Sequence, residues 1–160
     1  MADGQTMQPP LSLVISKLTS EAGHLEIKRG SDPVLTLNGG LRLHGDRPIA
    51  VYLARSSGLY PESHAAAAAD VDQYLALCEH YAAALPDQME QLTLHLEARM
   101  VSRTCLVGHQ VSIADVALWL LYSGRNRDSE KAPNMCRWLD YVGAVYSLPQ
   151  ITKACEIAMK

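Results

Sequence analysis

The sequence predicts a small α/β lobe followed by an all-helical lobe. The main observation is a change of hydrophobic period near Tyr60-Pro61. Before this point the apolar residues form short runs suited to strands, and after it they recur at helical spacing. With 160 residues, of which 48% are hydrophobic and 19% charged, the chain is long and apolar enough to bury a sizeable core.

The first ten residues, MADGQTMQPP, lack the positive start and the apolar core of a secretory signal. We therefore expect residues 1–10 to be a flexible tail, residues 11–60 to form the first lobe and residues 61–160 the second.

The first lobe is predicted to hold three or four short strands and one helix. The run LSLVI at 11–15 is typical of a strand, and LEIK at 25–28 alternates. The segments PVLTL and LRL flank Asn38-Gly39-Gly40, which indicates a hairpin because Asn and Gly accept a positive φ. Asp46 is predicted to cap a helix over 47–56 that Gly58 closes.

The second lobe begins with a helix that Ser63 can cap. Its predicted apolar stripe consists of Val71, Tyr74, Leu75, Cys78, Ala82 and Leu85. Pro86 should end this helix. Asp87 and Glu90 then form a capping box for the next helix, whose inner positions are Met89, Leu92, Leu96 and Met100.

Two further helices are predicted after residue 130. The first spans 133–146 and turns inward Met135, Trp138, Leu139, Val142 and Tyr146. The last is short, opens at Pro149, and runs through Ile151 and Ile157.

Between these pairs of helices, the motif S-I-A-D marks the start of a central helix. With Ser112 as N-cap, Asp115 is the third helical residue, so its carboxylate can accept the Ser112 amide while the Ser112 hydroxyl accepts the Asp115 amide. Val111 and Val116 are spaced to form a hydrophobic staple. We interpret Asp115 as structural rather than catalytic, because no histidine, second carboxylate or metal motif lies at a useful spacing.

Composition argues against several functional classes. The formal net charge is −3, and the lysines and arginines are scattered, so an autonomous nucleic-acid binder is not predicted and tRNA is expected to be reached only indirectly. No apolar run is long enough to cross a bilayer, which favours a soluble, cytoplasmic protein. Four dispersed cysteines indicate buried reduced thiols, and the spacing of the six histidines indicates no metal site.

The segments G-x-x-x-S-x-A-D at 108–115, P-V-L-x-L at 33–37 and I-A-V-Y-L-A-R at 49–55 resemble the glutathione-transferase family. The resemblance covers nearly the whole chain. It implies a reduced thioredoxin-like lobe followed by a helical bundle, with a structural role for Pro33, whose peptide bond is cis in the family.

Narrower motifs resemble one branch of that family. They are YLAR and GLY within 52–60, R-T-x-L-V-G at 103–108, K-A-P at 131–133 and R-W at 137–138. They are similar to the N-terminal transferase-like domain of eukaryotic cytosolic glutamyl-tRNA synthetase or the glutamyl-prolyl enzyme. The stand-alone transferase-like scaffold subunit of the multisynthetase complex is the next closest match.

A transferase needs a hydroxyl or thiol at the start of the helix after its first strand to hold the glutathione thiolate. Only Ser16 and Ser20 are candidates, and both are better explained as turn or cap residues. The acidic-serine pair that the resemblance implies falls on Gly45 and Asp46 and is lost. The sequence therefore predicts no catalytic residue, no cofactor and no enzyme activity in this chain. A minimal glutathione-dependent transferase is the alternative.

The resemblance implies instead a docking domain that joins a glutamyl-tRNA synthetase, or a free scaffold subunit, to other transferase-like domains of a synthetase complex. One predicted interface is the outer face of the 133–146 helix, with Arg137, Asp140 and Tyr141, while Trp138 lies in the core. The alternative is an ordinary solvent-exposed face that binds no partner and carries an Arg137–Asp140 ion pair. Charge reversal at Arg137 is expected to weaken pairing and leave thermal stability nearly unchanged.

A second predicted interface combines the 47–56 helix with the start of the next, through Tyr52, Arg55 and Asp70. Tyr52 is equally well explained as a core residue. Which face pairs, and whether a homodimer competes with other partners, stays open at this point.

Overall fold

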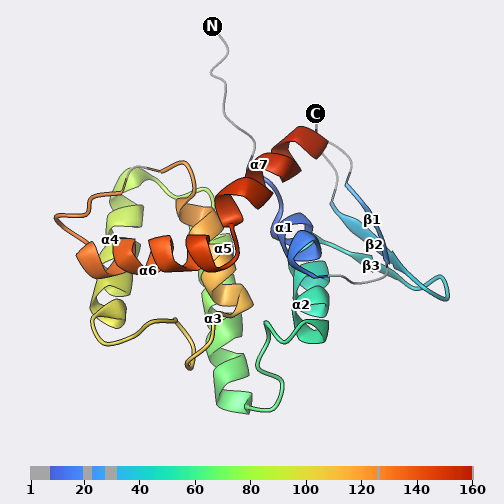
Figure 1. Cartoon of the computed structure of the whole chain (residues 1–160), viewed down its shortest axis with the longest axis horizontal. Coiled ribbons are helices and arrows are strands. Elements are labelled where there is room, and N and C mark those ends of the chain that lie inside the picture. Colours follow the sequence, from blue (N-terminus) through green and yellow to red (C-terminus); the bar gives the residue numbers. More distant parts are fainter. Residues whose placement is uncertain (1–7, 20–22, 28–31, 126, 160) are drawn as a thin grey trace, which may run out of the picture.

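The computed structural model describes residues 8–19, 23–27, 32–125 and 127–159. Figure 1 shows two lobes, with α1, α2 and the sheet on the right and the bundle of α3 to α6 on the left. The last helix, α7, packs against both α1 and α6 and so bridges the lobes. The elements in chain order are α1 (Leu11–Leu18), β1 (Gly23–Glu26), β2 (Val34–Leu37), β3 (Arg42–His44), α2 (Asp46–Ser56), α3 (Ala65–Tyr81), α4 (Pro86–Met100), α5 (Ile113–Tyr122), α6 (Pro133–Val145) and α7 (Leu148–Ala158).

The sheet has the order β1-β2-β3, and both pairs of neighbours are antiparallel. Leu35 pairs with Leu25 on one side and with Leu43 on the other, which places three leucines in a row across the sheet. The predicted hairpin at Asn38-Gly39-Gly40 is confirmed, with both glycines at positive φ (98° and 84°). The helices α1 and α2 pack side by side, and α2 contacts β3 of this small sheet.

The prediction of a strand over LSLVI is wrong, because this segment forms helix α1. The Asp46 carboxylate, 35 positions away in the chain, accepts the backbone amides of Leu11 (2.9 Å) and Ser12 (2.7 Å). It therefore satisfies two of the amides that every helix leaves unpaired at its start. Val14 and Ile15 are fully buried against the rest of the lobe. The sequence predicts that Asp46 caps its own helix. In the structure it caps α1 instead.

Two other expectations for the first lobe are corrected. Residues 1–7 of the predicted tail lie outside the described residues, but Pro9 is buried and the Gln8 side-chain amide donates to the carbonyl of Leu120. No described peptide bond is cis, so the bond before Pro33 is trans. The Pro33 carbonyl accepts the amide of Gly45 (3.0 Å), which ties the start of β2 to the start of α2.

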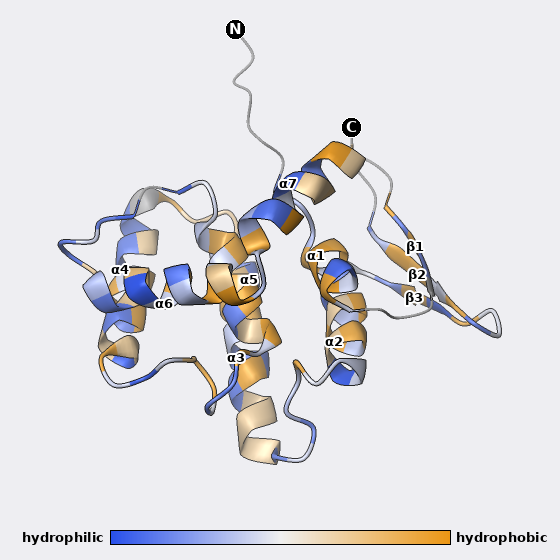
Figure 2. Cartoon of the chain, in the orientation of Figure 1, coloured by the Kyte–Doolittle hydropathy of each residue, from blue (hydrophilic) through white to orange (hydrophobic). Residues whose placement is uncertain are grey.

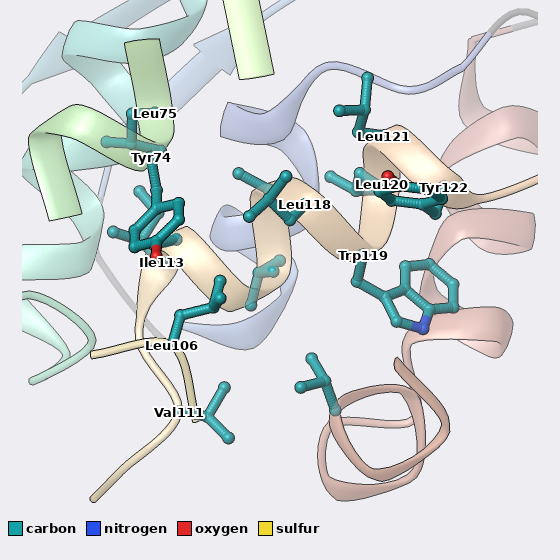
Figure 3. Close-up of a cluster of buried hydrophobic side chains, with 14 of the residues drawn as sticks. Tyr74, Leu75, Leu106, Val111, Ile113, Leu118, Trp119, Leu120, Leu121 and Tyr122 are labelled. Carbon is teal, nitrogen blue, oxygen red and sulfur yellow. The ribbon is translucent and has the colours of Figure 1, made fainter. Parts of the chain in front are cut away.

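The centre of the second lobe is α5, whose ten residues are all buried. Figure 2 shows it as a largely hydrophobic helix surrounded by helices with polar outer faces. In Figure 3, Tyr74 and Leu75 of α3 lie beside Ile113 at the start of α5. Near its end, α5 approaches α6 so closely that a Cβ atom on Gly143 would lie 2.7 Å from Nε1 of Trp119. A glycine is therefore required at that contact.

Most predicted inner faces are confirmed, and the exceptions lie at helix ends. The inner residues of α4 and α6 are buried, except that Tyr146 is half-buried. Helix α3 begins after His64 rather than Ser63 and ends at Tyr81, so Ala82 and Leu85 are exposed rather than part of the stripe. The predicted Asp87–Glu90 box is replaced by Gln88, whose side chain accepts the Leu85 amide (3.0 Å). The final helix begins at Leu148 and buries Leu148, Thr152 and Cys155, leaving Ile157 exposed.

The predicted capping box at the start of α5 is confirmed, and it is part of a larger buried network. Oδ2 of Asp115 accepts the amide (2.9 Å) and the hydroxyl (2.8 Å) of Ser112. Oδ1 accepts the amide of Leu106 (2.9 Å) and the indole N–H of Trp138 (2.9 Å). One fully buried carboxylate therefore joins the loop after α4, the start of α5 and the middle of α6.

Burial raises the pKa of Asp115 above its ordinary value, while the four donated hydrogen bonds act in the opposite direction. The same helix start is also tied to the first lobe, because the amide of Ile113 donates to the carbonyl of Leu59 (2.9 Å). Among the described residues, no helix is long and apolar enough to span a lipid bilayer.

We predict that Asp115→Asn lowers the free energy of unfolding by about 3 kcal/mol, because the new amide nitrogen would face two donors that now share one oxygen. Denaturant unfolding followed by circular dichroism measures the change. The matched control is Asp87→Asn, an exposed acid in the first turn of α4, which should shift stability by less than about 0.5 kcal/mol. Equal effects of the two substitutions would contradict the structural role of Asp115.

Candidate interaction surfaces and the start of the first helix

The outer face of α6 has the residues that the sequence predicted. Arg137, Asp140, Tyr141 and Ala144 are exposed, whereas Trp138 is only 1% exposed and bonds to Asp115. The arrangement follows from helical spacing, because residues three, four and seven apart share one side of a helix. Val145, which is 48% exposed, lies one turn beyond Tyr141 and extends this face with a second apolar side chain.

Arg137 has an intramolecular role that spacing alone did not reveal. Its Nη2 donates to the carbonyl of Met100 (2.8 Å), the last residue of α4. In return Glu97 of α4 accepts the amide of Met135 (2.9 Å) and the side-chain amide of Asn134, both in the first turn of α6. Each helix therefore supplies the charge that neutralises one end of the other. Sequence reasoning missed Glu97, since no local pattern links residues 97 and 135.

The Arg137–Asp140 ion pair of the alternative interpretation does not form; Asp140 instead lies 3.4 Å from Arg127, in the loop before α6. The Asp140 side chain is 78% exposed, so this ion pair contributes little to stability. Tyr141 is 42% exposed, and of the three predicted residues it is the one best placed to contact a partner without disturbing the helix pair α4 and α6.

The second predicted face is less coherent in the structure. Tyr52 on α2 is 36% exposed, which argues against a core role. Arg55 stacks over the Tyr60 ring at 4.9 Å and lies 3.6 Å from Glu62. Asp70 on α3 lies 3.6 Å from Arg99 of α4 and so is directed toward α4 rather than α2. The structure therefore groups Tyr52 with Arg55 and separates Asp70 from them.

The resemblance implies a thiolate site at the start of the lobe's first helix, which here is α1 and follows no strand among the described residues. Pro10 is the N-cap residue, and the amides of Leu11 and Ser12 are already bound by Asp46. Ser16 lies further along the helix and donates its hydroxyl to the carbonyl of Leu13 (2.7 Å). Ser20, the other candidate, lies outside the described residues.

A cavity of about 270 Å³ lies beside the start of α1, between the lobes. Its walls come from Gln8 to Leu11, the start of α2, α3 and α5. The thiol in its wall is Cys78, and burial raises its pKa to about 12, with a smaller contribution from the charge of Glu79. Burial also raises the pKa of Cys105 to about 11. Neither thiol is therefore activated as a nucleophile at neutral pH.

All four cysteines are free thiols; Cys105, Cys136 and Cys155 are buried and Cys78 is half-buried. In the part of the chain that the structure describes, no cluster of three or more His, Cys, Asp or Glu side chains is arranged to hold a metal ion.

The structure changes the expected effect of substituting Arg137. Arg137→Ala removes the bond to Met100 and should lower the free energy of unfolding by about 1 kcal/mol. Tyr141→Ala, on the same exposed face, should change it by less than about 0.5 kcal/mol. Thermal and denaturant unfolding compare the two variants. An Arg137→Ala protein as stable as wild type would show that the guanidinium does not cap α4.

Comparison with known proteins identifies the fold. No protein-family model matches the chain. The structure resembles a delta-class glutathione transferase of Nilaparvata lugens (TM-score 0.71, 16% identity, 96% of this chain and 92% of that chain). It is also similar to a glutathione transferase of Bombyx mori (0.72, 16%, 94% and 92%) and to a beta-class transferase of Sphingomonas chungbukensis (0.69, 16%, 91% and 92%).

In sequence, the chain is 26% identical over 152 residues to the cytoplasmic glutamate–tRNA ligase of Arabidopsis thaliana. The match covers 87% of this chain and 21% of the ligase, so the chain spans about a fifth of that relative's length. The resemblance that the sequence motifs predicted is confirmed. The chain has the glutathione-transferase fold and is similar in sequence to part of a cytoplasmic glutamate–tRNA ligase.

Proposed function

We propose that this chain is a non-catalytic docking domain that pairs with other transferase-like domains and so joins a glutamyl-tRNA synthetase to a synthetase complex. The domain is either an appendage of the synthetase or a free scaffold subunit in the cytoplasm. tRNA is reached through the parent or partner protein. The observation that carries the proposal is the Asp46 carboxylate bound across the start of α1.

The start of a helix attracts anions because its first amides are unpaired and its dipole end is positive. In this chain the Asp46 carboxylate already accepts the amides of Leu11 (2.9 Å) and Ser12 (2.7 Å) and lies at the positive end of the helix dipole. A glutathione thiolate at the same place would lose those donors and would face the like charge of Asp46. The chain therefore keeps the transferase fold, while Asp46 disfavours binding of a thiolate at the start of α1.

The outer surface supplies the alternative use of the fold. The α6 face combines exposed Tyr141 and Val145 with the charged groups of Arg137 and Asp140. Aromatic and arginine side chains are enriched at the centres of protein interfaces. The α2 face, with Tyr52 and Arg55, is the second candidate for pairing, including pairing with another copy of this chain.

A minimal glutathione-dependent transferase remains the competing function. The inter-lobe cavity beside α1 and the structural similarity to transferases favour it. Neither candidate nucleophile favours this function. The Ser16 hydroxyl donates to the carbonyl of Leu13 in its own helix, and the pKa of the Cys78 thiol in the cavity wall is raised.

Titration with reduced glutathione by isothermal calorimetry separates the two functions. The wild-type chain is expected to release no binding heat. A saturable glutathione isotherm for wild type would favour the transferase.

Asp46→Ala should lower the free energy of unfolding by about 1–2 kcal/mol, because both capping bonds are lost, and Asp46→Asn should lower it less because one oxygen still accepts an amide.

Pairing is tested with the purified transferase-like scaffold subunit and the other transferase-like domains of the synthetase complex, by size-exclusion chromatography with light scattering. Tyr141→Glu should abolish pairing if α6 is the interface, and Tyr52→Glu should do so if α2 is, because each places an unpaired charge at the centre of the contact. Melting temperatures of both variants should match wild type. The docking proposal fails if no complex forms with any of these domains.

A further inference from the structure

A groove on the second lobe lies apart from the start of α1 and from the α2 face. It has a volume of about 530 Å³, within the range of ligand pockets. Its walls are α4, the end of α5, the loop before α6 and the first turn of α6. We call it the α4–α5 groove. The residues used below are Met89, Thr93 and Leu94 of α4, Tyr122 of α5, Met135 of α6, and the loop cations Arg125, Arg127 and Lys131.

The floor of the α4–α5 groove is apolar and rich in sulphur. Met89 is 8% exposed and Met135 is 1% exposed, so both thioethers are part of the packed lobe that forms the groove's wall. Leu94 stands at the rim with 58% of its surface exposed. Methionines adapt their shape to a guest and make favourable contacts with aromatic rings, so this floor suits a flat aromatic side chain.

Two hydroxyl groups determine the polarity of the groove wall. Thr93 donates its proton to the carbonyl of Met89 (2.8 Å), so in its 3.0 Å contact with Tyr122 the tyrosine must be the donor. Burial raises the pKa of Tyr122, which keeps that proton in place at neutral pH. Both protons are therefore used internally. The pair offers a guest only oxygen lone pairs, which accept a hydrogen bond.

The rim carries more cations than carboxylates. Arg125, Arg127 and Lys131 line it, against the carboxylates of Glu90 and Asp128. Asp128 is turned toward its own loop, where one oxygen accepts the amides of Glu130 and Lys131 (both 3.1 Å). Arg125 donates to the carbonyl of Ala82 (3.2 Å). Arg127 lies 3.4 Å from Asp140, and Lys131 lies 4.0 Å from Asp128.

These contacts leave donors for a partner. Each guanidinium has five N–H groups, of which the contacts above use one, and the Lys131 side chain is 74% exposed. The whole chain has a net charge of −3, whereas the groove lining carries three cations against two carboxylates, a local excess of one positive charge. Three cations spaced along one loop match several carboxylates on an extended segment better than one carboxylate on a small molecule.

We propose that the α4–α5 groove binds a linear segment of a partner protein that carries a tryptophan or tyrosine flanked by acidic residues. The aromatic ring lies against Met89, above the buried Met135, and its N–H or O–H donates to the hydroxyl oxygen of Tyr122. The flanking carboxylates pair with Arg125, Arg127 and Lys131. Leu94 covers the exposed edge of the ring.

The probe is a blocked synthetic peptide with a central tryptophan and two acidic residues on each side, titrated into the whole chain by fluorescence anisotropy of a labelled copy. Control peptides replace the tryptophan with alanine, replace it with phenylalanine, or replace the acids with lysines. The tryptophan peptide should bind about tenfold more tightly than the alanine peptide, because an aromatic anchor dominates such contacts. The lysine peptide should not bind, because its charges match those of the rim.

Variants test the site itself. Leu94→Glu should weaken the tryptophan peptide about tenfold, while Val101→Glu, an equally exposed apolar residue just after α4, should not. Lys131→Glu should weaken it, and Lys153→Glu on α7 should not. Tyr122→Phe should weaken the tryptophan peptide about fivefold and leave the phenylalanine peptide unchanged, because only tryptophan uses the hydroxyl. Thermal melting checks that each variant is folded.

The proposal is overturned if the tryptophan peptide binds no better than the alanine peptide, or if Leu94→Glu and Val101→Glu have equal effects. It is also overturned if Tyr122→Phe weakens both aromatic peptides alike, since the hydroxyl would then act through the fold. This groove does not depend on the docking role proposed above. Loss of peptide binding with pairing intact, or the reverse, would show which of the two proposals fails.

Discussion

The buried carboxylate of Asp115 is the interaction on which the second lobe depends. It accepts four hydrogen bonds, from the loop after α4, from the N-cap of α5 and from the indole of α6. A charge in an apolar interior is stable only when it is so fully paired, and the pairing fixes three chain segments at one point. Ile113 also bonds to Leu59, so the same point is joined to the first lobe.

A second carboxylate, Asp46, binds the first two amides of α1 in the first lobe. Transferase folds present the positive end of their first helix to a ligand, whereas this chain uses that end to anchor α1 to the start of α2. Under the proposed docking function, the outer faces of α6 and α2 are the surfaces available to a partner, and the groove beside α4 is a further one. Arg137 is both a candidate interface residue and a structural one, because it lies on the exposed α6 face and also caps α4.

Sequence reasoning succeeded where the determinants are local and failed where they are not. The capping box at Ser112 and Asp115, the hairpin at Asn38-Gly39-Gly40 and the burial of Trp138 follow from spacings of a few residues. The helix over LSLVI was missed because a five-residue apolar run suits either structure, and the group that decides, Asp46, lies 35 positions away. Likewise, the bonds from Trp138 to Asp115 and from Arg137 to Met100 join distant parts of the chain. The six residues predicted for interfaces lie on the expected helices α2, α3 and α6, and their role in pairing stays a prediction. The intramolecular partners of Arg55, Asp70, Arg137 and Asp140 could not be read from the sequence.

We propose that the start of α1 is closed to glutathione by a side chain of the protein itself, Asp46. Nuclear magnetic resonance of the ¹⁵N-labelled chain tests it at the atoms concerned, the backbone amides of Leu11 and Ser12. Both resonances should stay unchanged as reduced glutathione is added to millimolar concentration. The Asp46→Asn substitution should shift both resonances even without glutathione, because it changes their hydrogen-bond acceptor. Glutathione-dependent shifts of these two amides in the wild-type protein would contradict the account.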